Sequence, residues 1–158
     1  MGSLIRALVA DDNAVVRDGL VRLLDVVPDV SVVASCADGD EVVTAAERTH
    51  PDVVVLDLVM PRVGGLEAAA RLLAVQPDTR VVILTAHLSA AAVREARRLG
   101  VAGYLLKDDD PLELPHHIRR VAGGGTAWHP AAVAEGDLPF LTETEFPDTH
   151  RDATPPTP

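Results

Sequence analysis

The chain is poor in several residue types, and each shortage excludes some classes of protein. It has one cysteine, Cys36, among 158 residues, so no disulfide can form within it, which fits a reducing cytosol. Its apolar runs are far too short to span a bilayer, and the start of the chain reaches Asp11 and Asp12 too soon for a signal peptide. Aromatic residues make up only 3%, so any core must be built from Val, Leu and Ala.

Basic residues are also scarce, with 14 Lys and Arg against 24 Asp and Glu. The net charge of -10 has the wrong sign for general binding to nucleic acid or to an anionic membrane surface. All but one of the basic residues are arginine, a bias that GC-rich codon usage explains. Codon usage does not explain why the single lysine, Lys107, follows a predicted strand, where a site that needs a compact ammonium would retain it.

What the chain does contain is a regular alternation of short apolar runs and helical patterns. We expect strands at 5–10, 30–35, 53–57, 80–85 and 102–106, and helices at 14–26, 39–48, 65–75, 89–99 and 111–122. Such alternation is typical of βαβ units in a parallel sheet. Five units with right-handed crossovers predict an α/β fold, a flavodoxin-like (βα)5 doubly wound parallel sheet with strand order 2-1-3-4-5.

Local signals place the ends of several helices. Asn13 and Ser89 are predicted N-caps, and Gly100 is a predicted helix end. Pro115 conflicts with a helix that begins at residue 111, because a proline one turn into a helix removes a hydrogen bond. This helix is therefore predicted to be bent or to begin later, near His116.

We expect a domain boundary after residue 125. Residues 1–125 hold all the predicted elements, whereas the helical and strand patterns fade from residue 126 on. Residues 135–158 are rich in acids and prolines and contain one base, a composition that cannot bury a core. Residues 126–158 are therefore predicted to be a linker followed by a disordered, acidic, proline-rich tail.

Four of the predicted strands end in polar residues of complementary chemistry. Asp11 and Asp12 follow the first strand, and the third, fourth and fifth strands lead into Asp57, Thr85 and Lys107. The carboxyl ends of parallel strands share one edge of the sheet, where ligands bind. Three carboxylates there would suit a hard cation such as Mg²⁺, and Asp57 could act as a nucleophile toward a phosphoryl group. Each residue alone is explained as well by capping, strand propensity or solvent exposure, so the prediction depends on their conjunction.

Other candidate groups carry weaker signals. Tyr104, the only tyrosine, is by itself expected to be half-buried on an outer strand. The six histidines show no metal-ligand spacing with Cys36 and are interpreted as structural or surface residues. The arginines of the last two predicted helices are interpreted as a solvated face, with a partner-binding patch as the alternative.

Four segments together resemble the receiver domain of two-component response regulators, and their sequences are most similar to those of the NarL/LuxR-type branch. They are LVADD at 8–12, VLDLVMP at 55–61, LTA at 84–86 and GYLLK at 103–107. The resemblance covers about residues 4–125. It implies that Asp57 is the phosphoacceptor, that Asp12 and Asp57 bind Mg²⁺ directly with the Val59 carbonyl, and that Asp11 helps through water.

The resemblance also implies a switch and its partners. Thr85 and Tyr104 would form the switch pair, and Lys107 would contact the phosphoryl group. The phosphoryl group would come from a sensor histidine kinase or a small phosphodonor and be hydrolysed slowly. The chain is thus expected to be a cytoplasmic signalling switch and not an enzyme. The face formed by the fourth helix, fifth strand and fifth helix would bind a second copy or a downstream protein.

Two departures leave alternatives open. Pro115 is unexpected in this family's fifth helix. Residues 141–145, LTETE, resemble the opening of a LuxR-type helix-turn-helix, but the residues that follow cannot build its helices. The chain is therefore expected to be a stand-alone receiver with a vestigial tail, or a truncated or frameshifted transcriptional regulator, without DNA binding of its own.

A Mg²⁺ phosphatase of the haloacid-dehalogenase type is the alternative from another class. It also combines an Asp nucleophile with Thr, Lys and Mg²⁺, but it carries a second acid two residues after the nucleophile. Here that position is Val59, and the strand before Asp57 is the third instead of the first, which disfavours this alternative.

Overall fold

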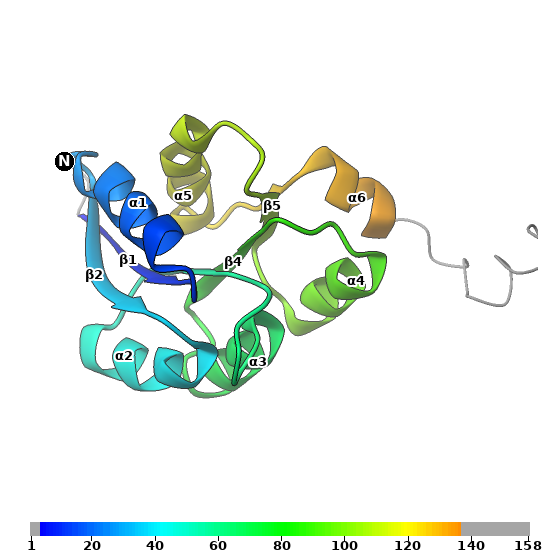
Figure 1. Cartoon of the computed structure of the whole chain (residues 1–158), viewed down its shortest axis with the longest axis horizontal. Coiled ribbons are helices and arrows are strands. Elements are labelled where there is room, and N and C mark those ends of the chain that lie inside the picture. Colours follow the sequence, from blue (N-terminus) through cyan, green and yellow to red (C-terminus); the bar gives the residue numbers. More distant parts are fainter. Residues whose placement is uncertain (1–3, 137–158) are drawn as a thin grey trace, which may run out of the picture.

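Six parallel strands form one sheet in residues 4–136, the part of the chain that the computed structural model describes (Figure 1). They are β1 (Ile5–Ala10), β2 (Val30–Cys36), β3 (Val53–Leu56), β4 (Arg80–Thr85), β5 (Gly103–Leu106) and β6 (Ala127–Trp128). Their order across the sheet is β2-β1-β3-β4-β5-β6. The predicted flavodoxin-like arrangement and the order of the first five strands are confirmed, and β6 is added outside β5.

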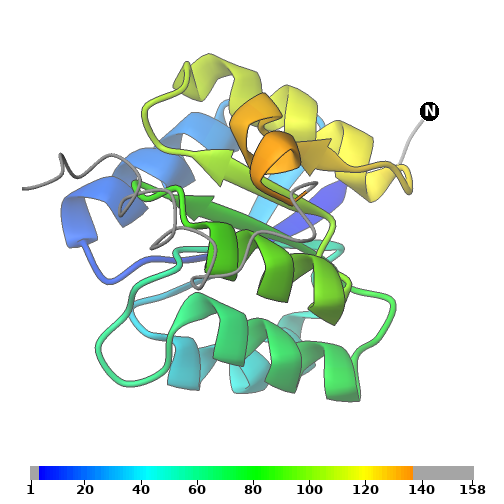
Figure 2. The ribbon, with the colours of Figure 1, turned by 90° about the vertical axis from the view of Figure 1, so that its right-hand side faces the viewer.

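Helices cover both faces of the sheet. They are α1 (Ala14–Asp25), α2 (Val42–Thr49), α3 (Gly65–Val75), α4 (Ala90–Leu99), α5 (Leu114–Ala122) and α6 (Pro130–Gly136), with short 3₁₀ turns η1 (Gly39–Glu41) and η2 (Pro111–Glu113). Helices α1 and α5 lie on one face, and α2, α3 and α4 lie on the other (Figures 1 and 2). The helices in residues 4–136 all fall short of the length and apolar character that a membrane span needs.

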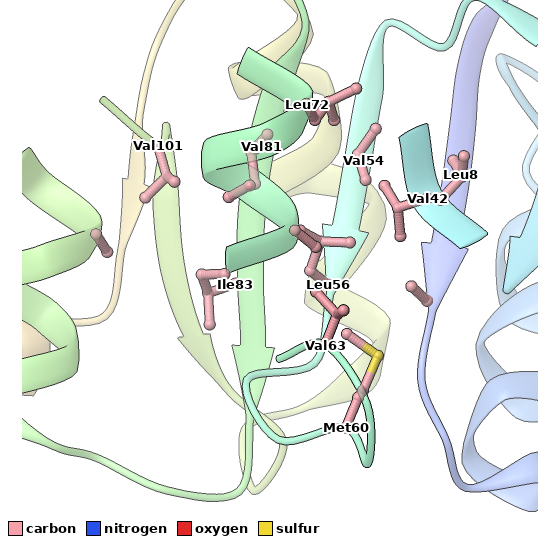
Figure 3. Close-up of a cluster of buried hydrophobic side chains, with 14 of the residues drawn as sticks. Leu8, Val42, Val54, Leu56, Met60, Val63, Leu72, Val81, Ile83 and Val101 are labelled. Atoms are coloured by element: carbon pink, nitrogen blue, oxygen red, sulfur yellow. The ribbon is translucent and has the colours of Figure 1, made fainter. Parts of the chain in front are cut away.

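The sheet separates two buried apolar clusters, because successive side chains of a strand point to opposite faces. The cluster toward α2, α3 and α4 includes Leu56, Leu72 and Ile83 (Figure 3). The cluster toward α1 and α5 includes Val55 and Ile118. The inner strands are buried on both faces, which explains why their sequences are continuous apolar runs.

The predicted helix ends are observed. Asn13 accepts hydrogen bonds from two N–H groups in the first turn of α1, and Ser89 Oγ accepts one from Ala92 at 3.2 Å. Gly100 ends α4 with φ of 84°, a conformation that costs glycine little. Local sequence therefore determines where these helices begin and end.

Pro115 is compatible with α5 because the helix begins only at Leu114, after the separate turn η2. Asp110 caps that turn by accepting a hydrogen bond from Leu112 N–H at 2.9 Å. Pro115 then lies in the first turn of α5, where a backbone N–H has no partner within the helix and its loss costs little. The predicted later start is confirmed, although it falls slightly before His116.

The fold continues beyond residue 125, which corrects the predicted boundary there. Strand β6 pairs with β5, and the pairing is flanked by two hydrogen bonds of 2.9 Å, from Ala127 N–H to Ala102 O and from His129 N–H to Tyr104 O. Ala127 and Ala132 are buried in the two clusters. A strand of two residues is too short to show a period, so only its contacts reveal it. The tail predicted beyond α6 lies outside the described residues.

Helix α6 lies against α4 (Figure 2). Side-chain contacts join the β6–α6 segment to α4 and to the loop after β5. The Arg97 guanidinium stacks over the Trp128 ring, 4.7 Å from its centroid. His129 Nδ1 accepts a hydrogen bond from Ala131 N–H at 3.0 Å, and its Nε2 lies 3.3 Å from an Asp109 carboxylate oxygen. The outer edge of β5 and part of α4, which were expected to form a partner surface, are covered by this segment.

Candidate functional site: a carboxylate cluster at the end of the sheet

Asp11, Asp12 and Asp57 come together at the carboxyl end of the sheet. Each offers a carboxylate oxygen, and these oxygens all lie within 4.8 Å of one another. Strands β1 and β3 are neighbours, with Ala10 paired to Leu56, so the residues that follow them emerge side by side. The Asp57 N–H donates to the Ala10 carbonyl at 2.9 Å, which extends the strand pairing to the acid itself.

The three acids differ in burial. Asp11 is 1% exposed and Asp57 8%, whereas Asp12 is exposed. Burial raises the pKa of Asp57, Lys107 opposes that rise, and the negative charge of Asp11 adds to it. A cation among these carboxylates would therefore offset both the repulsion between the acids and the cost of burying the Asp57 charge.

Lys107 supplies one such positive charge. Its Nζ lies 2.6 Å from an Asp11 oxygen and 3.3 Å from an Asp57 oxygen. Burial alone would lower the pKa of Lys107, but the two carboxylates outweigh it and raise the pKa. Lys107 is therefore an ammonium at neutral pH, held directly beside Asp57.

Thr85 closes the end of β4 next to Lys107. It is fully buried, and its carbonyl accepts a hydrogen bond from the Lys107 N–H at 2.8 Å. The Thr85 hydroxyl oxygen accepts a hydrogen bond from the His87 N–H at 3.2 Å. Thr85 thus connects the carboxyl edge of the sheet to the segment that leads into α4.

Tyr104 is fully buried, so the expectation that it is half-buried on an outer strand is wrong. Its side chain lies in the buried cluster that also holds Val93 and Ala96 of α4 and Ala132 of α6. The Tyr104 hydroxyl donates to the His87 carbonyl at 2.8 Å, and burial raises the pKa of the phenol. His87, whose backbone the sequence did not single out, therefore contacts both Thr85 and Tyr104.

The loop after Asp57 is tightly folded. Gly65 packs so close to Asp57 that a Cβ atom there would collide with the Asp57 carbonyl, and its N–H donates to Leu58 O at 2.9 Å. Val59, whose carbonyl is a candidate metal ligand, is exposed.

Sequence reasoning missed Asp38, whose carboxylate accepts hydrogen bonds from this loop. An Asp-Gly pair between strand and helix was its only sequence signal, and many turns share that signal.

The residues present fit a Mg²⁺ ion. Hard cations prefer carboxylate oxygens, and the clustered oxygens of Asp11, Asp12 and Asp57 could hold one. The Val59 carbonyl stays a predicted ligand. When bound, the ion would neutralise charge on phosphoryl oxygens.

Comparison with known proteins identifies the class to which this fold and site belong. The family model of the response regulator receiver domain matches residues 7–119. The chain belongs to the response regulator receiver family. This membership leaves the phosphatase alternative without support.

Individual relatives agree with this assignment. The chain is 37% identical over 131 residues to the uncharacterized transcriptional regulatory protein YxjL of Bacillus subtilis, covering 83% of this chain and 60% of that protein. It is 36% identical over 126 residues to the transcriptional regulatory protein DegU of Brevibacillus brevis, covering 80% and 53%. The chain thus spans little more than half the length of these relatives.

Solved structures agree as well. A two-component response regulator of the LuxR family from Aurantimonas sp. matches with a TM-score of 0.80 and 35% identity, over 85% of this chain and 96% of that one. The signal receiver domain of the putative response regulator NarL from Mycobacterium tuberculosis matches with a TM-score of 0.74 and 34% identity, over 78% and 99%.

Mg²⁺ is expected to stabilise the protein, because a dication relieves the repulsion among the three carboxylates. At a hundredfold excess over its dissociation constant, it should add about 2.7 kcal/mol to the free energy of unfolding. Thermal melts in EDTA and in Mg²⁺ measure this difference. Asp12→Ala should remove most of the rise, whereas Asp18→Ala, an exposed acid on α1, should retain it. Equal stabilisation of wild type and Asp12→Ala would place the ion elsewhere.

Asp57→Asn is expected to stabilise the metal-free protein in a pH-dependent way. Because the folded state raises the pKa of Asp57, wild type loses stability as pH rises from the unfolded value of about 3.9 through the raised one. The variant lacks this loss. Its advantage in melting temperature in EDTA should therefore be small at pH 4 or below and grow toward neutral pH. A difference that stays constant with pH would contradict this.

Proposed function

We propose that this chain is a phospho-accepting receiver that takes a phosphoryl group from a sensor histidine kinase onto Asp57 and changes a partner-binding surface in response. One observation carries the proposal. A buried carboxylate, Asp57, lies beside an ammonium and two further acids at the carboxyl edge of a parallel sheet. Family membership supports a signalling role, and the absence of a membrane-spanning helix in residues 4–136 is consistent with the proposed cytoplasmic location.

The proposed chemistry is the transfer of a phosphoryl group from a phosphohistidine to Asp57. An Asp57 carboxylate oxygen attacks the phosphorus of a phosphohistidine, the P–N bond breaks, and the released imidazole nitrogen keeps the electron pair and takes a proton. The product is an acyl phosphate on Asp57, which water later hydrolyses to the free carboxylate and inorganic phosphate. The Lys107 ammonium, 3.3 Å from Asp57, is placed to contact the transferred group.

Incubation with acetyl phosphate and Mg²⁺, followed by intact-mass measurement, tests this proposal. One added phosphoryl group is expected, and it should disappear slowly after the donor is removed. A chain that stays unmodified under conditions where Mg²⁺ binds would contradict the proposed function.

A continuous set of contacts would carry the signal outward. The Thr85 hydroxyl accepts from the His87 N–H, and the His87 carbonyl accepts from the Tyr104 hydroxyl. His87 leads into α4, whose Arg97 stacks on Trp128. We propose that a phosphoryl group on Asp57 draws the Thr85 hydroxyl toward it, releases His87 and thereby moves α4. Tyr104 is already buried, so this response does not require it to move inward.

Trp128 is expected to report this change, since it is the only tryptophan in the chain. Phosphorylation should shift its fluorescence emission in wild type. Thr85→Ala should accept the phosphoryl group, as intact mass would show, but give a much smaller shift. Thr79→Ala, at the opposite end of β4, is the matched control and should behave as wild type. Equal emission shifts in phosphorylated wild type and Thr85→Ala would refute the role of Thr85.

We also propose that this chain does not bind DNA itself. The two relatives described above are named transcriptional regulatory proteins, but this chain spans only part of their length. A net charge of -10 would repel DNA phosphates. The proposed output is a protein contact, made by a second copy of the chain or by a downstream protein.

A further inference from the structure

Asp38 connects the loop that follows β2 to the loop that follows β3. It lies between β2 and η1 and is 3% exposed. Its carboxylate accepts hydrogen bonds from the backbone N–H groups of Arg62 at 2.9 Å, Val63 at 3.0 Å and Asp40 at 3.2 Å. Two of these donors belong to the loop that follows Asp57, so Asp38 holds that loop from the β2 side.

Neighbouring residues strengthen the connection. The Gly39 N–H donates to the Val63 carbonyl at 3.1 Å, and a Cβ atom at Gly39 would collide with that carbonyl. Only glycine permits this approach. The Arg62 Nε lies 2.9 Å from an Asp40 carboxylate oxygen, but both side chains are partly or largely exposed and this pair adds little stability. The buried Asp38 is therefore the principal polar anchor.

The anchored loop carries one of the candidate metal ligands. Val59 is 60% exposed, so its own side chain does little to fix its backbone. Met60 and Val63 are buried and hold the apolar side of the loop (Figure 3). The loop ends at Gly65, whose N–H donates to Leu58 O at 2.9 Å. The position of the Val59 carbonyl therefore depends on anchors outside its own residue.

We propose that Asp38 is a positioning residue for the metal site, which fixes the loop bearing the Val59 carbonyl and so completes the ligand set. This proposal rests on the proposed function. Residues behind a ligand that hold it in place typically contribute tenfold or more to metal affinity, which sets the expected effect. Removing the carboxylate would leave two loop N–H groups without a buried acceptor.

Asp38 is ionised under working conditions. Burial raises the pKa of its carboxyl group, but the N–H donors of Arg62, Asp40 and Val63 outweigh burial and leave the pKa at about 2. The carboxylate therefore has acceptor capacity for all three donors at neutral pH. Asparagine would retain one acceptor oxygen and present an NH₂ group to the remaining donors.

Mg²⁺ titration of the full chain by calorimetry tests the proposal. Asp38→Ala is expected to raise the Mg²⁺ dissociation constant roughly tenfold, and Asp38→Asn by a smaller factor. Asp18→Ala is the matched control, because it removes an exposed acid of the same charge on α1 that contacts neither the loop nor the metal ligands. It should leave the dissociation constant within about twofold of wild type. Melting temperatures recorded alongside separate a loss of stability from a loss of affinity.

Several outcomes would overturn the role given to Asp38. An unchanged dissociation constant in Asp38→Ala, even with a lower melting temperature, would show that Asp38 serves the fold alone. Equal weakening by Asp18→Ala would show that net charge is responsible. Should Asp38→Ala not fold, Asp38→Asn decides by the same criteria. A wild type that binds no Mg²⁺ overturns the proposal as well. A wild type that binds Mg²⁺ but takes no phosphoryl group contradicts only the proposed function, and the titration still decides on Asp38.

Discussion

Asp57→Asn should abolish phosphoryl acceptance completely. Asparagine has nearly the same shape as aspartate, but its amide cannot act as the nucleophilic carboxylate that an acyl phosphate requires. Wild type incubated with acetyl phosphate and Mg²⁺ should gain one phosphoryl group by intact mass, and the variant should gain none. Because burial of the charged carboxylate is unfavourable, the variant should also fold at least as well as wild type in EDTA.

Asp52→Asn provides the matched control. Asp52 lies just before β3, at the opposite end of the strand from Asp57, and accepts a hydrogen bond from the Arg6 N–H at 2.8 Å. Asparagine can still accept that bond through its carbonyl oxygen. The control should be phosphorylated at the wild-type rate. Residual phosphorylation of Asp57→Asn at a rate close to wild type would move the acceptor to another residue.

Removing the β6–α6 segment should strongly destabilise the domain. A chain ending at Gly125 loses the burial of Ala127 and Ala132, the packing of Trp128 on Arg97, and the two hydrogen bonds to β5. The apolar surface that this segment buries contributes about 3 kcal/mol to the free energy of unfolding, so the melting temperature should fall by roughly 10 °C. Thermal unfolding followed by circular dichroism measures the difference.

A chain ending at Gly136 serves as the reference, because it retains both elements. Trp128→Ala within the full chain should reproduce part of the loss. The shorter chain also leaves an inner strand as a free edge, which favours pairing with a second molecule. We therefore expect it to self-associate in light scattering more than the reference does. Identical melting curves for the two shortened chains would show that residues 126–136 contribute nothing to stability.

Much of the fold could be predicted from local sequence because its signals are local. Apolar runs such as the one before Asp57 identify inner strands, and Asn13 and Gly100 delimit helices through bonds made within a few residues. Strand order followed from general rules for βαβ units. Three acids, a hydroxyl and an ammonium at strand ends were expected to share one edge, and the structure brings the three acids and the ammonium of Lys107 into direct proximity.

Other features depended on contacts between distant residues, which no local pattern records. The two-residue strand β6 is defined by its pairing with β5, and Tyr104 is buried in a cluster that includes Ala132 of α6. Asp38 looked like an ordinary turn residue until the fold placed its carboxylate against Arg62 and Val63, 24 and 25 residues away along the chain. Local patterns in the chain specify the elements, their order and the chemistry at the strand ends. How far the domain extends and which residues hold the site in place depend on tertiary contacts, because burial and hydrogen bonding across the sheet arise only once the chain has folded.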